Sequence, residues 1–232
     1  MTPPLILLPG LLCDATVWAP QKDALRGEFQ VAAWLHFYGH DSLAGMAREV
    51  LKAAPPRFAL AGHSMGGRVA LEIMRTSPER VERLALFDTT ASPATPDEPE
   101  KRREMVELGR TAGMAAVAAR WLPTIVHASR LNQPDFMSAL TAMICRATPE
   151  IYVRQVQALL NRPDYRPTLP QIACPTLVAC GRDDLLSPVD AHQEMAAAIP
   201  GAKLAVIENC GHMATVEAPA EVSSLLRGWL QE

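Results

Sequence analysis

The sequence predicts an α/β protein with a mainly parallel sheet of about six strands, helices on both sides of the sheet and an inserted helical cap. Short apolar runs bounded by glycine, proline or polar residues recur along the 232 residues. Amphipathic stretches separate most of these runs, and such strand–helix alternation is typical of a parallel sheet covered on both faces. One long stretch in the middle of the chain breaks the alternation, which indicates an insertion between two strands.

The apolar runs predict the strands. Because they do not alternate apolar with polar residues, each strand is expected to be buried on both of its faces. Residues 5–13 favour a buried strand over a lipoprotein signal, since no basic residue precedes them and Pro9-Gly10 interrupts the apolar run. In chain order the predicted strands are residues 5–8, 29–34, 58–61, 84–87, 176–179 and 203–207.

The amphipathic stretches predict the helices, with one apolar stripe facing the sheet and the opposite side facing solvent. His192 falls in the fourth of these stretches and is expected on a surface helix. Residues 97–104 mix acidic and basic side chains and are expected to form a solvated helix start. In chain order the predicted helices of the core are residues 18–25, 42–54, 65–76, 190–199 and 220–230.

The insertion is predicted at residues 91–166, where helix-like patterns occur without a convincing strand. Proline-rich segments at 92–99 and 161–170 open and close it and are interpreted as tethers. The predicted domain organisation is therefore a core of residues 1–90 and 167–232 that carries a helical cap.

Apolar side chains of the cap are candidates for a substrate pocket. Met105, Trp121 and Met143 are the residues predicted to line it, while most other apolar residues of the cap are expected to pack its own core. The predicted substrate is accordingly small and largely apolar.

Composition and charge exclude several classes of protein. The net charge is −3, from 22 basic and 25 acidic residues, and the basic residues are scattered, so no nucleic-acid partner is expected. The five cysteines are widely spaced without a CxxC pair, which predicts reduced thiols in a cytoplasmic protein and no metal site. No apolar run approaches the roughly 18 residues that a membrane-spanning helix needs, so no membrane partner is expected.

Ser64 is the candidate nucleophile. The segment Gly62-His63-Ser64-Met65-Gly66 fits the pattern G-x-S-x-G, with an apolar strand before it and a helix pattern after it. A serine on such a sharp strand-to-helix turn has a strained backbone, so side chains two positions away collide unless they are hydrogen. Gly62 and Gly66 provide that room. The alternative is a glycine-rich turn without chemistry.

A serine hydroxyl needs a base and an orienting carboxylate to act as a nucleophile at neutral pH. Asp183 and Asp184 follow one predicted strand, and His212 follows the next. All three lie just beyond carboxyl ends of strands, where open parallel sheets build their sites. The order serine, aspartate, histidine is the one expected for this architecture. From position alone both aspartates stay candidates, and Asp88, at the end of an earlier strand, is a weaker third.

The chain resembles the α/β-hydrolase family, in particular its compact, cap-bearing serine esterases. The resemblance covers nearly the whole chain and is strongest in four segments: residues 8–18, 62–70, 181–188 and 211–219. It implies Asp184 rather than Asp183 as the acid, because relatives place the acid three residues after the glycine. It also implies an oxyanion hole formed by the backbone N–H groups of Leu11 and Met65, although the family more often has His-Gly where this chain has Pro9-Gly10.

The function expected from these features is that of a serine hydrolase. Ser64, His212 and Asp184 would cleave a carboxylic ester, thioester or lactone through an acyl-enzyme, without a metal or organic cofactor. Carbon–carbon bond hydrolases and cofactor-free perhydrolases share the same three residues and are alternatives. A non-catalytic module that binds a small ligand is an alternative of another class. The sequence assigns no oligomeric state.

Overall fold

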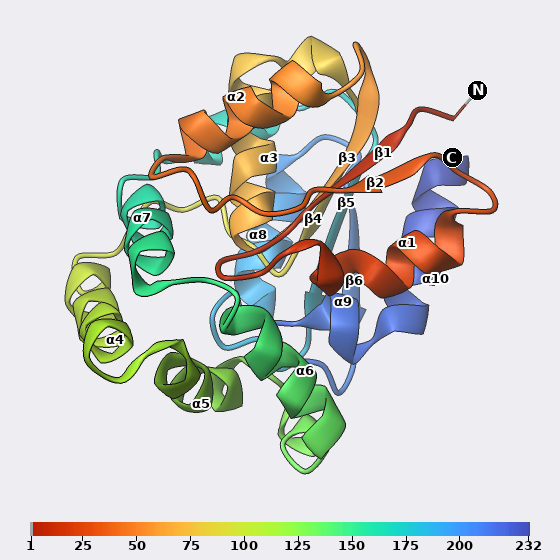
Figure 1. Ribbon diagram of the computed structural model, residues 1–232. Helices are drawn as coiled ribbons and strands as arrows, with labels where there is room; N and C mark the ends of the chain where they lie inside the picture. The colour runs from red at the N-terminus through yellow and green to blue at the C-terminus, as the bar shows by residue number, and fades with distance from the viewer. Residues whose placement is uncertain (1) are drawn as a thin grey trace.

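The computed structural model describes residues 2–232. Its centre is a sheet of six strands in the order β2-β1-β3-β4-β5-β6, with every neighbouring pair parallel (Figure 1). This arrangement confirms the predicted fold class. The strands are β1 (Leu5–Leu8), β2 (Val31–Ala33), β3 (Phe58–His63), β4 (Val81–Phe87), β5 (Thr176–Gly181) and β6 (Lys203–Ile207).

Burial of the strands follows their place in the sheet. Of the four inner strands, β1, β3 and β5 are buried throughout, as their continuous apolar runs predict. The fourth, β4, is buried except at Glu82 and Arg83 near its amino end. The prediction is wrong for the two edge strands, since β2 is only half-buried and β6 begins with the exposed residues Lys203 and Leu204. An edge strand has a neighbour on one side only, and helices cover it less completely.

Helices cover both faces of the sheet (Figure 1). Helix α2 packs against α3, while α1 packs against α10. No helix in residues 2–232 has the length and apolar character needed to cross a membrane. The helices of the core are α1 (Ala19–Leu25), α2 (Leu43–Ala53), α3 (Met65–Thr76), α8 (Val189–Ala198), α9 (Ala214–Glu217) and α10 (Pro219–Gln231).

Four further helices lie between β4 and β5, at the carboxyl-end side of the sheet (Figure 1). Helix α4 packs against α5 and α7, and α5 also packs against α6, so the four form one layer. The described residues between β4 and β5 contain no strand. The four are α4 (Glu98–Ala112), α5 (Met114–Ile125), α6 (Pro134–Ile144) and α7 (Pro149–Leu160).

Candidate active site

Ser64 lies on the turn between β3 and α3 in a conformation that L-residues rarely adopt, with φ 53° and ψ −115°. The flanking glycines allow this turn. A Cβ atom on Gly62 would lie 2.3 Å from the carbonyl oxygen of Gly66, and one on Gly66 would lie 2.4 Å from the carbonyl oxygen of Leu8. The turn is therefore packed too closely for any side chain at either glycine, in agreement with the steric argument from the sequence.

A continuous chain of hydrogen bonds joins Ser64, His212 and Asp184. The Nδ1 atom of His212 lies 2.8 Å from Oδ2 of Asp184, and Nε2 lies 2.8 Å from Oγ of Ser64. A carboxylate only accepts, so Nδ1 carries the proton and Nε2 is left to accept from the serine hydroxyl. The arrangement has the geometry of a nucleophile, a base and an orienting acid.

Asp184 is held in its charged form. Burial alone would raise the pKa of this carboxyl, but the charge and hydrogen bond of His212 and the N–H groups of Ser187 and Leu186 outweigh burial, so the pKa lies below its ordinary value. Both N–H groups donate to Oδ1 at 2.9 Å. Asp183 turns the other way, half-exposed, with its carboxylate 3.7 Å from Nε2 of His127. Of the two aspartates, only Asp184 contacts His212.

Asp88 supports the loops of the site rather than His212 itself. Its carboxylate accepts from the N–H groups of Gly181 and Ala214, at 3.1 Å each. Burial, followed by the charge of Asp184, raises the pKa of Asp88 well above its ordinary value. The structure thus joins Asp88 to the ends of two loops, and it is not the partner of Nδ1. Asp88 directly follows the buried end of β4, which is the position that makes it a candidate in the sequence.

Three residues that the sequence did not single out support the backbone around Ser64. Gln155 of α7 accepts from the N–H of Leu12 at 2.9 Å, which ties the turn after β1 to the inserted helices. Ile125 at the end of α5 accepts from the N–H of His212 at 2.7 Å. Thr89 donates its hydroxyl to the carbonyl of Ser64 at 2.8 Å. No sequence pattern marks these contacts, because each depends on how distant segments pack.

His192 is buried, although the sequence places it on a surface helix. Its Nε2 accepts from the N–H of Thr89 at 3.1 Å, and its Nδ1 lies 3.1 Å from the carbonyl of Pro188. Helix α8 packs against β5, so this side chain points inward. Burial lowers the pKa of His192, which keeps the imidazole neutral.

The amides of Leu11 and Met65 lie at the two turns beside the nucleophile. Leu11 lines the same cavity as Ser64 and His212, and Met65 is the first residue of α3. In residues 2–232 neither N–H is bonded to a backbone carbonyl. Met65 is fully buried, and of the two residues only Leu11 is among those described as lining the cavity. Two such donors aimed at one oxygen would stabilise an oxyanion.

A cavity of about 480 Å³ lies between the sheet and the inserted helices. Ser64 and His212 line it, together with Met105 and Trp121. The prediction for Met143 is wrong: it does not line this cavity and is buried instead. An apolar helical stripe packs against whichever neighbour covers it, and for this part of α6 the neighbours are protein. His40, in the loop before α2, pairs with Glu49 and does not line the cavity.

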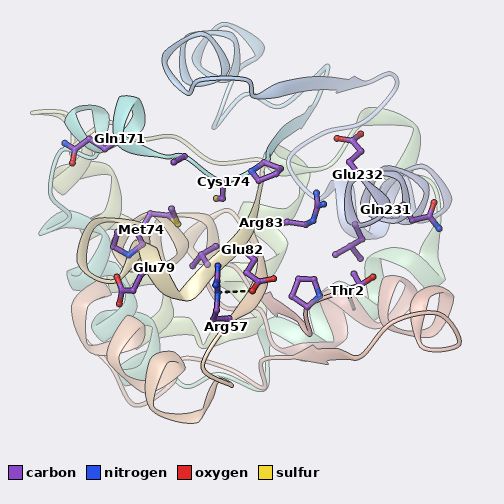
Figure 2. Close-up of a pocket in the computed structure, with 16 residues that line it drawn as sticks. Thr2, Arg57, Met74, Glu79, Glu82, Arg83, Gln171, Cys174, Gln231 and Glu232 are labelled. Carbon is purple, nitrogen blue, oxygen red and sulfur yellow. Dashed lines mark ion pairs between the residues drawn. The ribbon is translucent and has the colours of Figure 1, made fainter.

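A second hollow, of about 1060 Å³, lies at the opposite end of the sheet (Figure 2). It is lined by residues at the amino ends of strands, among them Arg83 and Pro175, and Arg57 pairs with Glu82 there at 2.9 Å. None of the predicted site residues lies in it. No group of three or more metal-ligating side chains occurs in the described part of the chain.

Comparison with known proteins places these features in a family. The model of the alpha/beta hydrolase family matches residues 5–225. A putative carbamate hydrolase RutD of Serratia proteamaculans is 30% identical, over 99% of this chain and 91% of that protein. Among solved structures, a thermophilic esterase from Thermogutta terrifontis matches with a TM-score of 0.88 and 31% identity, over 98% of this chain and 89% of that one. An enol-lactonase from Burkholderia xenovorans matches with a TM-score of 0.89 and 26% identity, over 100% of this chain and 92% of that one.

Proposed function

Because this chain belongs to the alpha/beta hydrolase family, we propose that it is a serine hydrolase that cleaves a carboxylic ester, thioester or lactone through an acyl-enzyme. The observation that carries the proposal is the hydrogen-bond chain from Ser64 through His212 to Asp184, at 2.8 Å for each link. An esterase and an enol-lactonase among the similar structures support an ester-like carbonyl as the target.

In the first half of the proposed reaction, Ser64 Oγ attacks the substrate carbonyl while its proton passes to His212 Nε2. The carbonyl oxygen becomes an oxyanion that accepts from the N–H groups of Leu11 and Met65. Asp184 stabilises the imidazolium that forms, and its lowered pKa supports a charged carboxylate in this role. His212 then gives the proton to the departing alcohol, thiol or enol, which leaves the acyl group on Ser64.

In the second half, water replaces the leaving group. His212 takes a proton from the water as it attacks the acyl-enzyme, and the same N–H groups hold the second oxyanion. Collapse of this intermediate returns the proton to Ser64 and releases the acid. Every proton transfer uses groups of this chain, so the proposed mechanism calls for no metal or organic cofactor.

We propose that residues 91–166 act as a cap over Ser64. Two observations support this role: Met105 of α4 and Trp121 of α5 line the cavity, and Ile125 of α5 accepts from the N–H of His212. The cap would therefore shape the substrate site and fix the base at the same time.

All five cysteines are free, which supports a reducing compartment such as the cytoplasm.

The proposal is tested with a panel of p-nitrophenyl esters of graded chain length, beside a lactone and an acyl thioester, for the wild type and Ser64→Ala. We expect kcat/KM for the best substrate to fall by about 10³-fold or more in the variant, because loss of the nucleophile leaves only binding and oxyanion stabilisation. Full activity of Ser64→Ala would refute the serine mechanism. A folded wild type that hydrolyses none of the panel would favour a ligand-binding module.

A further inference from the structure

One end of the active-site cavity is lined by more positive than negative charge. Three arginines, Arg68, Arg102 and Arg162, line it, and Glu98 is the single carboxylate among the lining residues described. Lys101 also lines the cavity, but its ammonium is paired with Asp97 at 2.5 Å. Glu98 and Arg102 thus turn inward, although the sequence predicts a solvated helix start.

Arg162 is fully engaged by the protein. It donates to the carbonyls of Ser92, Pro93 and Leu159 and to both carboxylate oxygens of Glu98, at 2.6 to 3.1 Å. These five bonds match the five N–H donors of a guanidinium. Arg162 therefore joins the two tethers of the insertion and holds Glu98 in place, with no donor left for a ligand.

Arg102 competes for the same carboxylate. Its Nε and Nη2 both lie 2.7 Å from Oε1 of Glu98, the oxygen that Arg162 also contacts. Burial would raise the pKa of Glu98, but the two guanidiniums outweigh it and lower the pKa to about 2. One carboxylate therefore serves two cations, and its charge neutralises only one of them.

Arg68 has no carboxylate partner in residues 2–232. Its Nη2 donates to Oγ1 of Thr90 at 3.0 Å, while its Nε is buried without any acceptor. Burial, followed by the charges of Arg162 and Arg102, lowers the pKa of Arg68 to about 9. Arg68 is half-buried, and a cation that is partly removed from water without a counter-charge is costly. A negative group at this point would relieve that cost.

Arg68 lines the same cavity as Ser64 and His212. Arg68 follows Ser64 by four residues on α3, which corresponds to about 6 Å along the helix axis. The N–H of Arg68 is bonded to the carbonyl of Ser64 at 3.2 Å, which fixes that turn. An anion bound here would therefore belong to the molecule whose carbonyl Ser64 attacks.

We propose that Arg68 and Arg102 bind a carboxylate of the substrate, so that the ester or lactone hydrolysed by this protein is an acidic one. The inference rests on the proposed function. A guanidinium offers parallel N–H donors that match the two oxygens of a carboxylate. The site would select substrates through this ion pair, while Met105 and Trp121 contact the apolar part.

The test compares methyl half-esters of dicarboxylic acids, from succinate to suberate, with the same esters in which a primary amide replaces the carboxylate. A second series places the carboxylate, or its amide, on the alcohol side of a butyrate ester. We expect the wild type to show higher kcat/KM for the acid than for the amide in at least one series. In Arg68→Gln this acid-to-amide ratio should fall about 10- to 100-fold, as expected for loss of a hydrogen bond between charged groups. Arg68→Lys keeps the positive charge and should therefore keep part of the wild-type acid-to-amide ratio.

Arg103→Gln is the matched control, because Arg103 lies next to Arg102 on α4, is exposed and pairs with Glu100 away from the cavity. Its acid-to-amide ratio should equal that of the wild type. The inference is overturned if no acid is preferred over its amide, or if Arg68→Gln keeps the wild-type ratio. Labelling of Ser64 by a fluorophosphonate distinguishes failure of this inference from failure of the proposed function. A protein that is labelled but does not prefer acids refutes only the inference. A protein that is not labelled refutes the proposed function.

Discussion

The imidazole of His63 lies 2.8 Å, through its Nε2, from the backbone carbonyl of His212. A carbonyl only accepts, so Nε2 carries the proton and donates. The residue before the proposed nucleophile therefore holds the backbone of the proposed base. His63 is buried, and its Nδ1 has no partner in the described part of the chain. The same loop is held from the other side by Ile125, whose carbonyl accepts from the N–H of His212.

Replacement of His63 should slow the reaction without weakening substrate binding. In His63→Leu the donor is lost, so His212 is positioned less well, and kcat should fall about fivefold for the loss of roughly 1 kcal/mol. KM should change little, because His63 does not line the cavity. His63→Gln retains an N–H donor and should recover part of kcat. Equal kcat values for the two variants would contradict this role. The measurement is steady-state kinetics on the best ester, with circular dichroism as a check on folding.

The two neighbouring aspartates should behave differently. Asp184→Asn should lower kcat by about 10³- to 10⁴-fold, because the amide no longer fixes the tautomer of His212 or stabilises its positive charge. Asp183→Asn is the matched control and should stay within about twofold of the wild type, since the Asp183 side chain is half-exposed and its carboxylate faces His127, at 3.7 Å, rather than His212. If Asp183→Asn were the more damaging change, the assignment of the acid would be wrong.

A methyl group at Gly62, on the turn between β3 and α3, should destabilise the fold. In Gly62→Ala the new carbon would meet the Gly66 carbonyl oxygen at 2.3 Å, which the rigid turn cannot relieve without moving Ser64. We expect Tm to fall by several degrees and activity to fall with it. Gly27→Ala is the control, because nothing lies within 4 Å of a Cβ atom at Gly27. Thermal unfolding of the two variants checks the prediction, and an unchanged Tm for Gly62→Ala would show that the turn adapts.

Stability should fall in mild acid because of the buried histidines. Burial and then the charge of His212 lower the pKa of His63 to about 3, against 6.5 for an ordinary histidine. Between these two values the unfolded chain binds a proton that the folded chain does not, so the free energy of unfolding rises with pH and is lost as pH falls. The slope for one histidine is about 1.4 kcal/mol per pH unit. His192, whose pKa is also lowered, acts in the same direction.

Urea unfolding at pH 7.5, 6.0 and 5.0 measures this dependence. The free energy of unfolding should decline below about pH 6.5, and the decline should be less steep in His63→Gln, which removes one of the two groups. A variant with the same slope as the wild type would show that His63 is protonated in the folded protein.

The elements that the sequence predicted are those whose signals are local. Ser64 directly follows the buried strand β3, and the G-x-S-x-G pattern expresses the steric requirement of the turn that carries it. His212 lies in the loop after the next strand but two, β6. The choice between Asp184 and Asp183 has no local signal, because both follow the same strand and only the path of the turn decides which one faces inward. The family resemblance supplied that choice, and position after the strand did not.

The charged end of the cavity had no local signal. Arg68 belongs to the core and Glu98 and Arg102 to α4, while Arg162 follows α7, so their meeting depends on how the inserted helices dock on the sheet. The mixed run of charges at residues 97–104 predicts a solvated helix surface when only its own residues are considered. Met143 was misassigned for the same reason, since an apolar helix face is identical in sequence whether it meets protein or a cavity.

Ser64 is expected to form a covalent bond with the substrate, and reaction with a fluorophosphonate probe is the direct test of its nucleophilicity. Mass spectrometry of the treated wild type should show the mass of one phosphonyl group, mapped to the peptide that contains Ser64. Ser64→Ala, treated in the same way and shown to be folded, should gain no mass. A wild type that stays unlabelled, or a label that persists in Ser64→Ala, would contradict the assignment of Ser64 as the nucleophile.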